Sequence, residues 1–90
     1  MKALKWLGNA LDVVRGFPEV ARKQAGYQLY RVQSGLEPSD WKSMTIVGAG
    51  VCEIRIPVKD EFRVIYVAGF EEVRIRPPRI SEEDSQDIQA

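Results

Sequence analysis

Histidine is absent from this chain of 90 residues, and cysteine occurs only once, as Cys52. Without histidine there can be no His-based triad, no His-liganded zinc and no imidazole base that titrates near neutral pH. A single cysteine excludes an internal disulfide. We therefore predict no metal site and no cofactor, and any acid–base chemistry would fall to lysine, tyrosine or carboxylate side chains.

Long hydrophobic runs are also missing. No segment approaches the roughly 18–20 consecutive apolar residues of a membrane-spanning helix, and residues 1–8 lack the apolar core of a signal peptide. The composition, 44% hydrophobic and 29% charged, is that of an ordinary globular protein. We expect a cytoplasmic protein with no membrane partner.

Charge divides the chain into two parts. Residues 81–90 hold four of the 13 acidic residues and none of the 13 basic ones, so residues 1–80 carry 13 basic against nine acidic groups. We predict a single domain over residues 1–80 and an acidic tail or short helix over 81–90. A weakly basic domain is compatible with nucleic-acid binding but does not demand it.

Two helices are predicted in the first third of the chain. Asn9 can cap a short helix that Gly16 closes, and Pro18 suits the first position of a second helix that ends near Gly35. The second helix carries an apolar stripe at helical spacing, formed by Ala21, Ala25, Leu29 and Val32. This helical hairpin needs a sheet to cover its stripe.

Two strands with alternating apolar residues follow over residues 51–56 and 62–68. A period of two is typical of a half-buried strand, and the two apolar sets must face the same core. Parity then sends Arg55 and Arg63 to the opposite face of the sheet.

The connection between these strands sets their register. If Ile56 faces Phe62 across a turn at residues 57–61, Arg55 and Arg63 are direct cross-strand neighbours. Like charges in that arrangement are destabilising. Such a pair therefore suggests an anion-binding site.

The remaining segments complete an α+β pattern. Residues 2–7 read as a first strand or an ordered arm, 36–43 as a loop, 44–47 and 73–76 as short strands, and 81–84 as the start of a truncated C-terminal helix. The predicted fold is α+β, with a helical hairpin packed on one face of a small antiparallel sheet.

The order of motifs resembles a known family. The matching segments are LKWLGNALDVVRGFPEVARKQAGYQLYRVQSG, EPSDWKSMTIVGAGVCEIRI and EFRVIYVAGFEE, within residues 3–72. They are similar to the HigB-like, phage-derived branch of the RelE/ParE toxin superfamily. The resemblance implies the toxin of a type II toxin–antitoxin system, a metal-independent endoribonuclease that cleaves mRNA on the ribosome. It also implies a helix-turn-helix antitoxin as partner.

Individual residues carry part of this resemblance. Arg55 and Arg63 match two family arginines, which implies catalytic roles, and Lys42 lies in the family's DWK segment, which implies RNA binding. Beyond Glu72 the chain departs from the family, because the histidine, the aromatic residue and the paired lysines of the usual last strand are absent. Either the RNA-binding role passes to three arginines or the site is incomplete; the three are Arg74, Arg76 and Arg79.

Several alternatives stay open at this point. Arg55 and Arg63 could be solvated residues paired with Glu53 and Glu61. The chain could also be an impaired toxin that serves as an antitoxin-binding module, or a gyrase inhibitor of the ParE kind. An exposed edge on the last strand would allow a homodimer.

Overall fold

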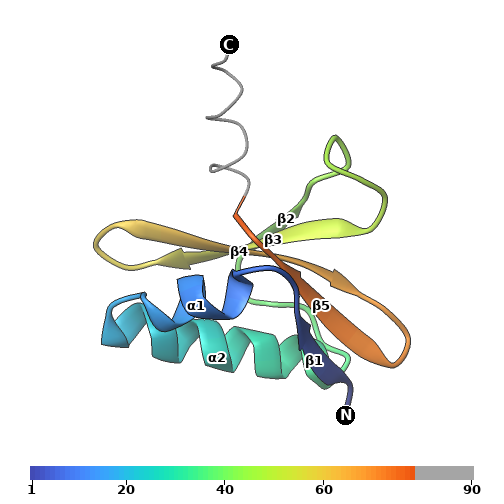
Figure 1. Ribbon diagram of the computed structural model, residues 1–90, viewed down its shortest axis with the longest axis horizontal. Coiled ribbons are helices and arrows are strands. Elements are labelled where there is room, and N and C mark those ends of the chain that lie inside the picture. Colours follow the sequence, from blue (N-terminus) through green and yellow to red (C-terminus); the bar gives the residue numbers. More distant parts are fainter. Residues whose placement is uncertain (79–90) are drawn as a thin grey trace.

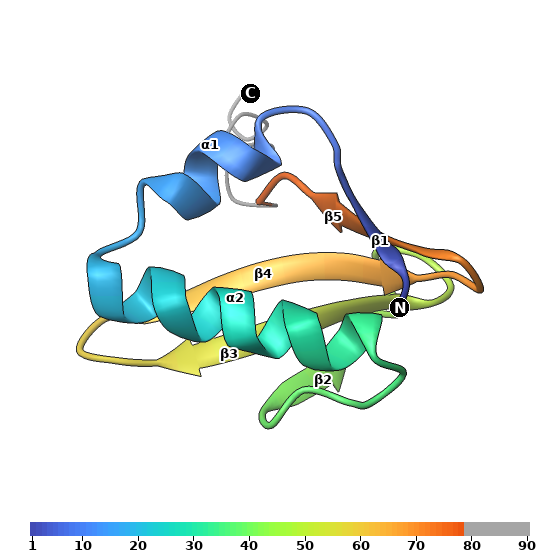
Figure 2. The ribbon, with the colours of Figure 1, turned by 90° about the horizontal axis from the view of Figure 1, so that it is seen from below.

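The computed structural model describes residues 1–78 and contains two helices and five strands (Figure 1). In chain order the elements are β1 (Ala3–Trp6), α1 (Ala10–Arg15), α2 (Glu19–Gln33), β2 (Trp41–Ser43), β3 (Val51–Pro57), β4 (Glu61–Ala68) and β5 (Glu72–Arg76). Both helices lie on one side of the sheet, which confirms the α+β class (Figures 1 and 2). The predicted acidic tail, its short helix and Arg79 fall outside the described residues.

The sheet is mixed, so the prediction of a purely antiparallel sheet was wrong. Its strand order is β1-β5-β4-β3-β2, and β1 runs parallel to β5 while the other neighbours are antiparallel. Backbone hydrogen bonds from Ala3 N to Glu71 O (3.1 Å) and from Leu7 N to Ile75 O (2.9 Å) join the two ends of the described chain. Alternation of side chains indicates which face a residue occupies, but it does not indicate which distant strand lies alongside.

This pairing also removes the basis of the predicted homodimer. The prediction assumed that the last strand has a free edge, but β1 covers that edge of β5. Within residues 1–78 the two edge strands are β1 and β2. Both are short, at four and three residues, which limits the length over which another chain could pair.

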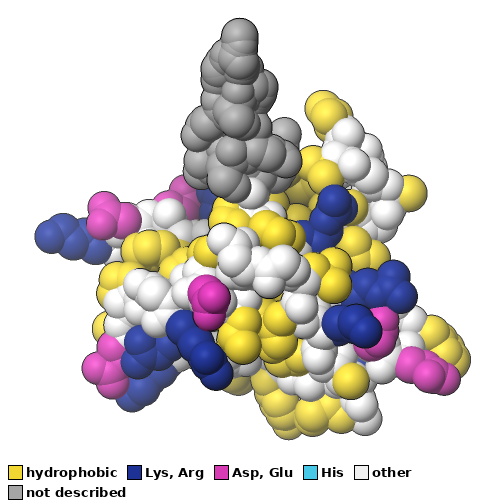
Figure 3. Space-filling model, in the orientation of Figure 1, with side chains coloured by type: hydrophobic (Ala, Val, Ile, Leu, Met, Phe, Trp, Pro, Cys, Tyr) yellow, Lys and Arg dark blue, Asp and Glu magenta, His cyan; other side chains and the backbone are white. Residues whose placement is uncertain are grey.

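The bounds of both helices agree with the prediction, but Asn9 makes no side-chain cap hydrogen bond, and Pro18 occupies the N-cap position of α2 rather than its first helical position. The stripe residues Ala21, Ala25, Leu29 and Val32 are all buried, and Gly35 follows the helix end with φ 86°, a left-handed conformation that glycine adopts readily. The outer side of α2 exposes Val20, Tyr27 and Tyr30, and Figure 3 shows hydrophobic side chains beneath this helix. Neither helix has the length and apolar character needed to cross a bilayer in the part of the chain described.

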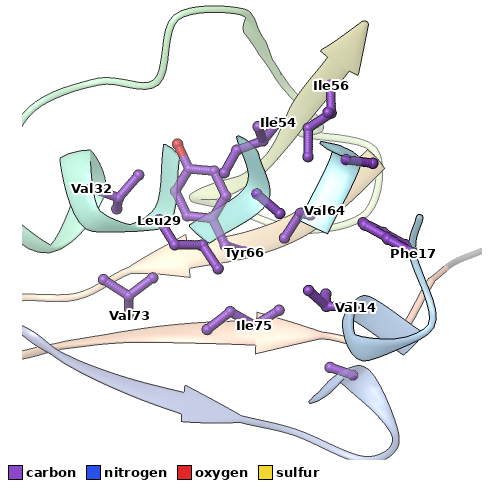
Figure 4. Close-up of a cluster of buried hydrophobic side chains, with 13 residues drawn as sticks. Val14, Phe17, Leu29, Val32, Ile54, Ile56, Val64, Tyr66, Val73 and Ile75 are labelled. Carbon is purple, nitrogen blue, oxygen red and sulfur yellow. The ribbon is translucent and has the colours of Figure 1, made fainter. Parts of the chain in front are cut away.

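The core lies between this helical stripe and the inner face of the sheet (Figure 4). Leu29 and Val32 of α2 meet apolar side chains from the three central strands, which include Ile54, Ile56, Val64, Tyr66, Val73 and Ile75. At one end the rings of Phe17 and Phe62 lie 4.9 Å apart between centroids. Because these residues face the helices, the residues between them in each strand must face away.

The second strand is not where the sequence suggested. Residues 44–47 were predicted as a strand, but they form a turn in which Val47 N donates to Met44 O at 2.9 Å. The strand instead comprises Trp41–Ser43, in a segment predicted as a loop, and Trp41 pairs with Ile54. The polar composition of this segment favoured a loop, but its last three residues form a short edge strand in which Lys42 faces away from the helices.

Truncating the core should cost far more than truncating the surface. Ile54→Ala removes a side chain with no exposed area and should lower the free energy of unfolding by about 2–5 kcal/mol. The matched control is Ile46→Ala, because Ile46 is 95% exposed and its loss should change stability by less than about 0.5 kcal/mol. Urea unfolding followed by circular dichroism measures both, and equal losses would contradict this assignment of the core.

Candidate nucleic-acid interface

The register of β3 and β4 brings two arginines together on the face of the sheet opposite α1 and α2, which we call the open face with respect to residues 1–78. Ile56 pairs with Phe62 and Arg55 pairs with Arg63, as the alternation predicted. The first pair contributes to the core, so the second lies on the side away from both helices. The prediction that Arg55 and Arg63 are direct cross-strand neighbours is thereby confirmed, while their catalytic role stays a prediction.

A row of residues crosses four strands beside this pair. Lys42 of β2 pairs with Glu53 of β3, Glu53 with Ile65 of β4, and Ile65 with Arg76 of β5. All four therefore lie on the open face, one row away from Arg55. Two residues predicted to bind RNA, Lys42 and Arg76, thus stand on either side of the carboxylate of Glu53.

A third row extends the basic surface toward the edge strand β1. Arg74 shares this row with Lys5 of β1, and it forms an ion pair with Glu72 at 2.7 Å. The row continues through Val67 to Val51. Lys5 was not predicted as part of the site, because its position depends on the parallel pairing of β1 with β5.

Glu53 is the only charged residue among those buried in the described part of the chain, with 5% of its surface exposed. Its two carboxylate oxygens lie 3.7 Å from Arg55 Nε and 4.0 Å from Arg63 Nε. On the solvent side, Arg63 Nη2 donates to Glu61 Oε1 at 3.1 Å. The ion pairs of that alternative are present, because Arg55 pairs with Glu53, and Arg63 pairs with both Glu53 and Glu61.

This carboxylate offsets the repulsion between the two arginines. Glu53 neighbours Arg55 two residues along the same strand and lies diagonally from Arg63, so it meets both guanidinium groups at once. Burial strengthens the attraction, because screening by water is reduced there. The sequence did carry a signal for Glu53, since parity places it on the same face as Arg55.

The position of Lys42 is set by a loop that is fastened to α2. Gln28 and Ser39 exchange two hydrogen bonds, at 2.8 and 3.1 Å, and Arg31 Nε donates to Glu37 O at 2.9 Å. These contacts hold the segment immediately before β2 against the helix. The prediction that Lys42 lies on a loop beside the sheet was therefore wrong, because Lys42 belongs to the strand β2 and the segment before it is anchored to α2.

Tyr66 lies on the other face and takes no part in this surface. It is buried in the core, and this burial, together with Cys52 and Glu37 nearby, raises the pKa of its hydroxyl group well above the usual range. A hollow of about 300 Å³ adjoins Tyr66, Cys52 and Trp41 on the helix side of the sheet. Tyr66 is therefore unsuited to carry protons at the arginine pair, and Trp41 does not offer a stacking surface there.

The open face can bind anions through several cations at once. Guanidinium groups grip phosphate through two parallel hydrogen bonds, and a lysine ammonium adds a compact charge. Across residues 1–78 no group of three or more Cys, Asp or Glu side chains is placed to hold a metal ion. Cations arranged in this way can hold a phosphodiester and neutralise charge that develops on it.

Comparison with known proteins places residues 12–75 in a family. These residues match the model of the family described as Phage derived protein Gp49-like (DUF891). No curated protein and no solved structure matches the chain. The resemblance to a phage-derived family is confirmed at this level, and the finer placement in the HigB-like branch stays a prediction.

Replacing Glu53 should show how much the repulsion between Arg55 and Arg63 destabilises the fold. We expect Glu53→Gln to lower the free energy of unfolding by roughly 1 kcal/mol, because it removes the charge that lies between Arg55 and Arg63. Glu61→Gln is the control, since its carboxylate is largely exposed, and it should change stability by less than about 0.5 kcal/mol. Urea unfolding of the purified variants measures both differences.

A third variant separates this explanation from a simple loss of packing. Arg63→Gln should be nearly neutral or stabilising when Glu53 is already glutamine, because it then relieves a repulsion, and destabilising when Glu53 is intact. The same destabilisation in both backgrounds would contradict the role given to Glu53.

Proposed function

Because the chain belongs to the family of phage-derived Gp49-like proteins, we propose that it is the toxin of a type II toxin–antitoxin system and cleaves mRNA on the ribosome. The family match supports a toxin-like role. The HigB-like motifs in residues 3–72 support the choice of mRNA as the target.

The observation that carries this proposal is the pairing of Arg55 with Arg63 on the face of the sheet opposite the two helices that the structure describes. Both arginines match the motif of the HigB-like branch, they pair directly across β3 and β4, and both approach the carboxylate of Glu53. A scissile phosphate bridging them would be held by two bidentate donors. Lys42, one strand away, would hold a neighbouring phosphate of the RNA.

Cleavage would proceed by attack of the adjacent 2′-oxygen on the phosphorus. The P–O5′ bond breaks, the 2′-oxygen loses a proton, and the departing 5′-oxygen gains one, which leaves a 2′,3′-cyclic phosphate and a 5′-hydroxyl group. Arg55 and Arg63 would align the phosphate and neutralise the charge that grows on its oxygens. Histidine cannot transfer these protons because the sequence has none, and Tyr66 cannot because it is buried in the core.

The last strand supports RNA binding by a different set of residues from the family's usual one. Arg74 and Arg76 of β5 lie on the same face as the arginine pair, so they can substitute for the missing lysines as phosphate contacts. Together with Lys5 they extend the basic surface toward β1. An RNA strand lying across the sheet would meet a cation on each of its five strands, with Lys42 as the cation of β2.

The partner proposed for this toxin is a helix-turn-helix antitoxin, which the resemblance implies. Two other functions predict different cellular outcomes. A binding module without nuclease activity would leave growth unaffected, and a gyrase inhibitor would induce a DNA damage response without cutting mRNA. Expression in a bacterium therefore separates all three.

We expect inducible expression of the wild-type chain to arrest growth and to create new mRNA 5′ ends in frame with codons. Arg55→Ala together with Arg63→Ala should abolish both effects, and Arg63→Ala alone should abolish growth arrest while the fold is retained. Growth curves and transcriptome-wide mapping of 5′ ends provide the measurement, with circular dichroism to verify folding.

The matched control for the double variant is Arg15→Ala with Lys23→Ala. It removes the same charge from the helix layer, where both residues are exposed, and it should leave arrest and cleavage unchanged. Unaltered cleavage by the Arg55/Arg63 variant, or equal loss in the control, would remove the arginine pair from the site.

A further inference from the structure

The open face holds a buried acid where an anion-binding surface would be expected to have none. Glu53 lies among the cations of three rows, and its carboxylate contacts the Nε edges of both Arg55 and Arg63. Neither distance, 3.7 Å or 4.0 Å, is short enough for a hydrogen bond. The acid therefore attracts both arginines without yet bonding to either.

One nitrogen in this cluster lacks a partner. Among the described residues, Arg55 Nε is the only buried side-chain nitrogen or oxygen with no hydrogen bond. A buried donor left in this state costs free energy, so it requires a physical explanation. Arg55 Nε forms an ion pair with Glu53 Oε1, which lies only slightly beyond hydrogen-bonding distance.

We infer that Glu53 is a positioning residue for phosphate binding by Arg55 and Arg63. In this arrangement the carboxylate contacts the Nε edge of each guanidinium group from the buried side, and the contact directs the terminal nitrogens toward solvent. When phosphate binds the terminal nitrogens of Arg55, the Nε–H group closes onto Glu53 and its missing hydrogen bond is made. This inference rests on the proposed function, in which the arginine pair grips RNA phosphate.

The burial of Glu53 makes this arrangement workable. With 5% of its surface exposed, the carboxylate lies below the arginine side chains, whose exposed fractions are 33% for Arg55 and 52% for Arg63. A phosphate arriving from solvent would therefore meet guanidinium groups before it meets the acid. Glu61 differs, because its side chain is 44% exposed and bonds a terminal nitrogen of Arg63 from the solvent side.

Charge and geometry predict opposite effects for Glu53→Gln. If only charge matters, removing a carboxylate from a phosphate-binding face reduces repulsion, and RNA binds more tightly. If Glu53 positions the arginines, RNA binds more weakly although the face has become more positive. The sign of the change in affinity therefore decides between the two explanations.

The test measures binding of a fluorescent 2′-O-methyl RNA oligonucleotide, which cannot be cleaved, by anisotropy. Glu53→Gln should weaken binding by about ten- to a hundredfold, the range for losing a charge-assisted hydrogen bond. The matched control, Glu61→Gln, should bind as well as the wild type or tighter by less than about twofold. Equal or tighter binding by Glu53→Gln would overturn the inference.

A second variant and a second measurement distinguish the loss of positioning from the loss of the folded structure. Glu53→Asp keeps the charge but shortens the side chain, which withdraws the carboxylate from the arginines. A positioning role therefore predicts weaker RNA binding, whereas a purely electrostatic role predicts unchanged binding. In the wild type, titration with inorganic phosphate should shift the Arg55 Nε–H signal in ¹⁵N NMR spectra. The shift should be lost in Glu53→Gln, and a shift that persists there would overturn the inference.

These results can be distinguished from failure of the proposed function. A wild-type chain that binds the oligonucleotide in a Glu53-dependent way but cuts no mRNA in cells would refute the nuclease and retain the positioning role. Cleavage in cells that is unaffected by Glu53→Gln would retain the nuclease and refute the positioning role. If the wild type does not bind the oligonucleotide, the phosphate titration alone decides the role of Glu53.

Discussion

The register of the β3–β4 hairpin controls both the core and the candidate site. Ile56 opposite Phe62 aligns the apolar residues of both strands toward the helices, and the same alignment sets Arg55 opposite Arg63 on the other face. A slip of one residue would turn every side chain of one strand over, which would bury an arginine and expose an isoleucine. The energetic demand of the core therefore enforces a pair of like charges that is unfavourable on its own.

The fold resolves this conflict with one buried carboxylate. Glu53 occupies the row beside the arginines and approaches both, so the cluster of three residues carries a net charge of one rather than two. The solution is local, because Glu53 is two residues from Arg55 in the same strand. It leaves the outer parts of both arginines accessible, which a mere structural ion pair would not need. The contacts that stabilise the arginine pair are thus the ones on which the proposed anion binding would depend.

Sequence alone predicted the parts of the structure that depend on local pattern. The helical stripe around Leu29 and the alternation that separates Ile54 from Arg55 both follow from periodicity, and both are confirmed. The parallel pairing of β1 with β5 could not be predicted in this way, so Lys5 was missed. The strand at Trp41 was missed because three residues are too few to show a period. Glu53 was considered only as a partner of solvated arginines, because alternation along a strand indicates the face of a residue but not its burial.

We propose that the open face of the sheet, rather than the helix layer, binds RNA. The most direct test is an NMR titration of the ¹⁵N-labelled chain with a non-cleavable RNA oligonucleotide, followed through the backbone amide signals. We expect shifts centred on Lys42, Arg55, Arg63 and Arg76, with the signals of α2 unchanged. Shifts centred on α2, around the exposed Tyr27 and Tyr30, would contradict it.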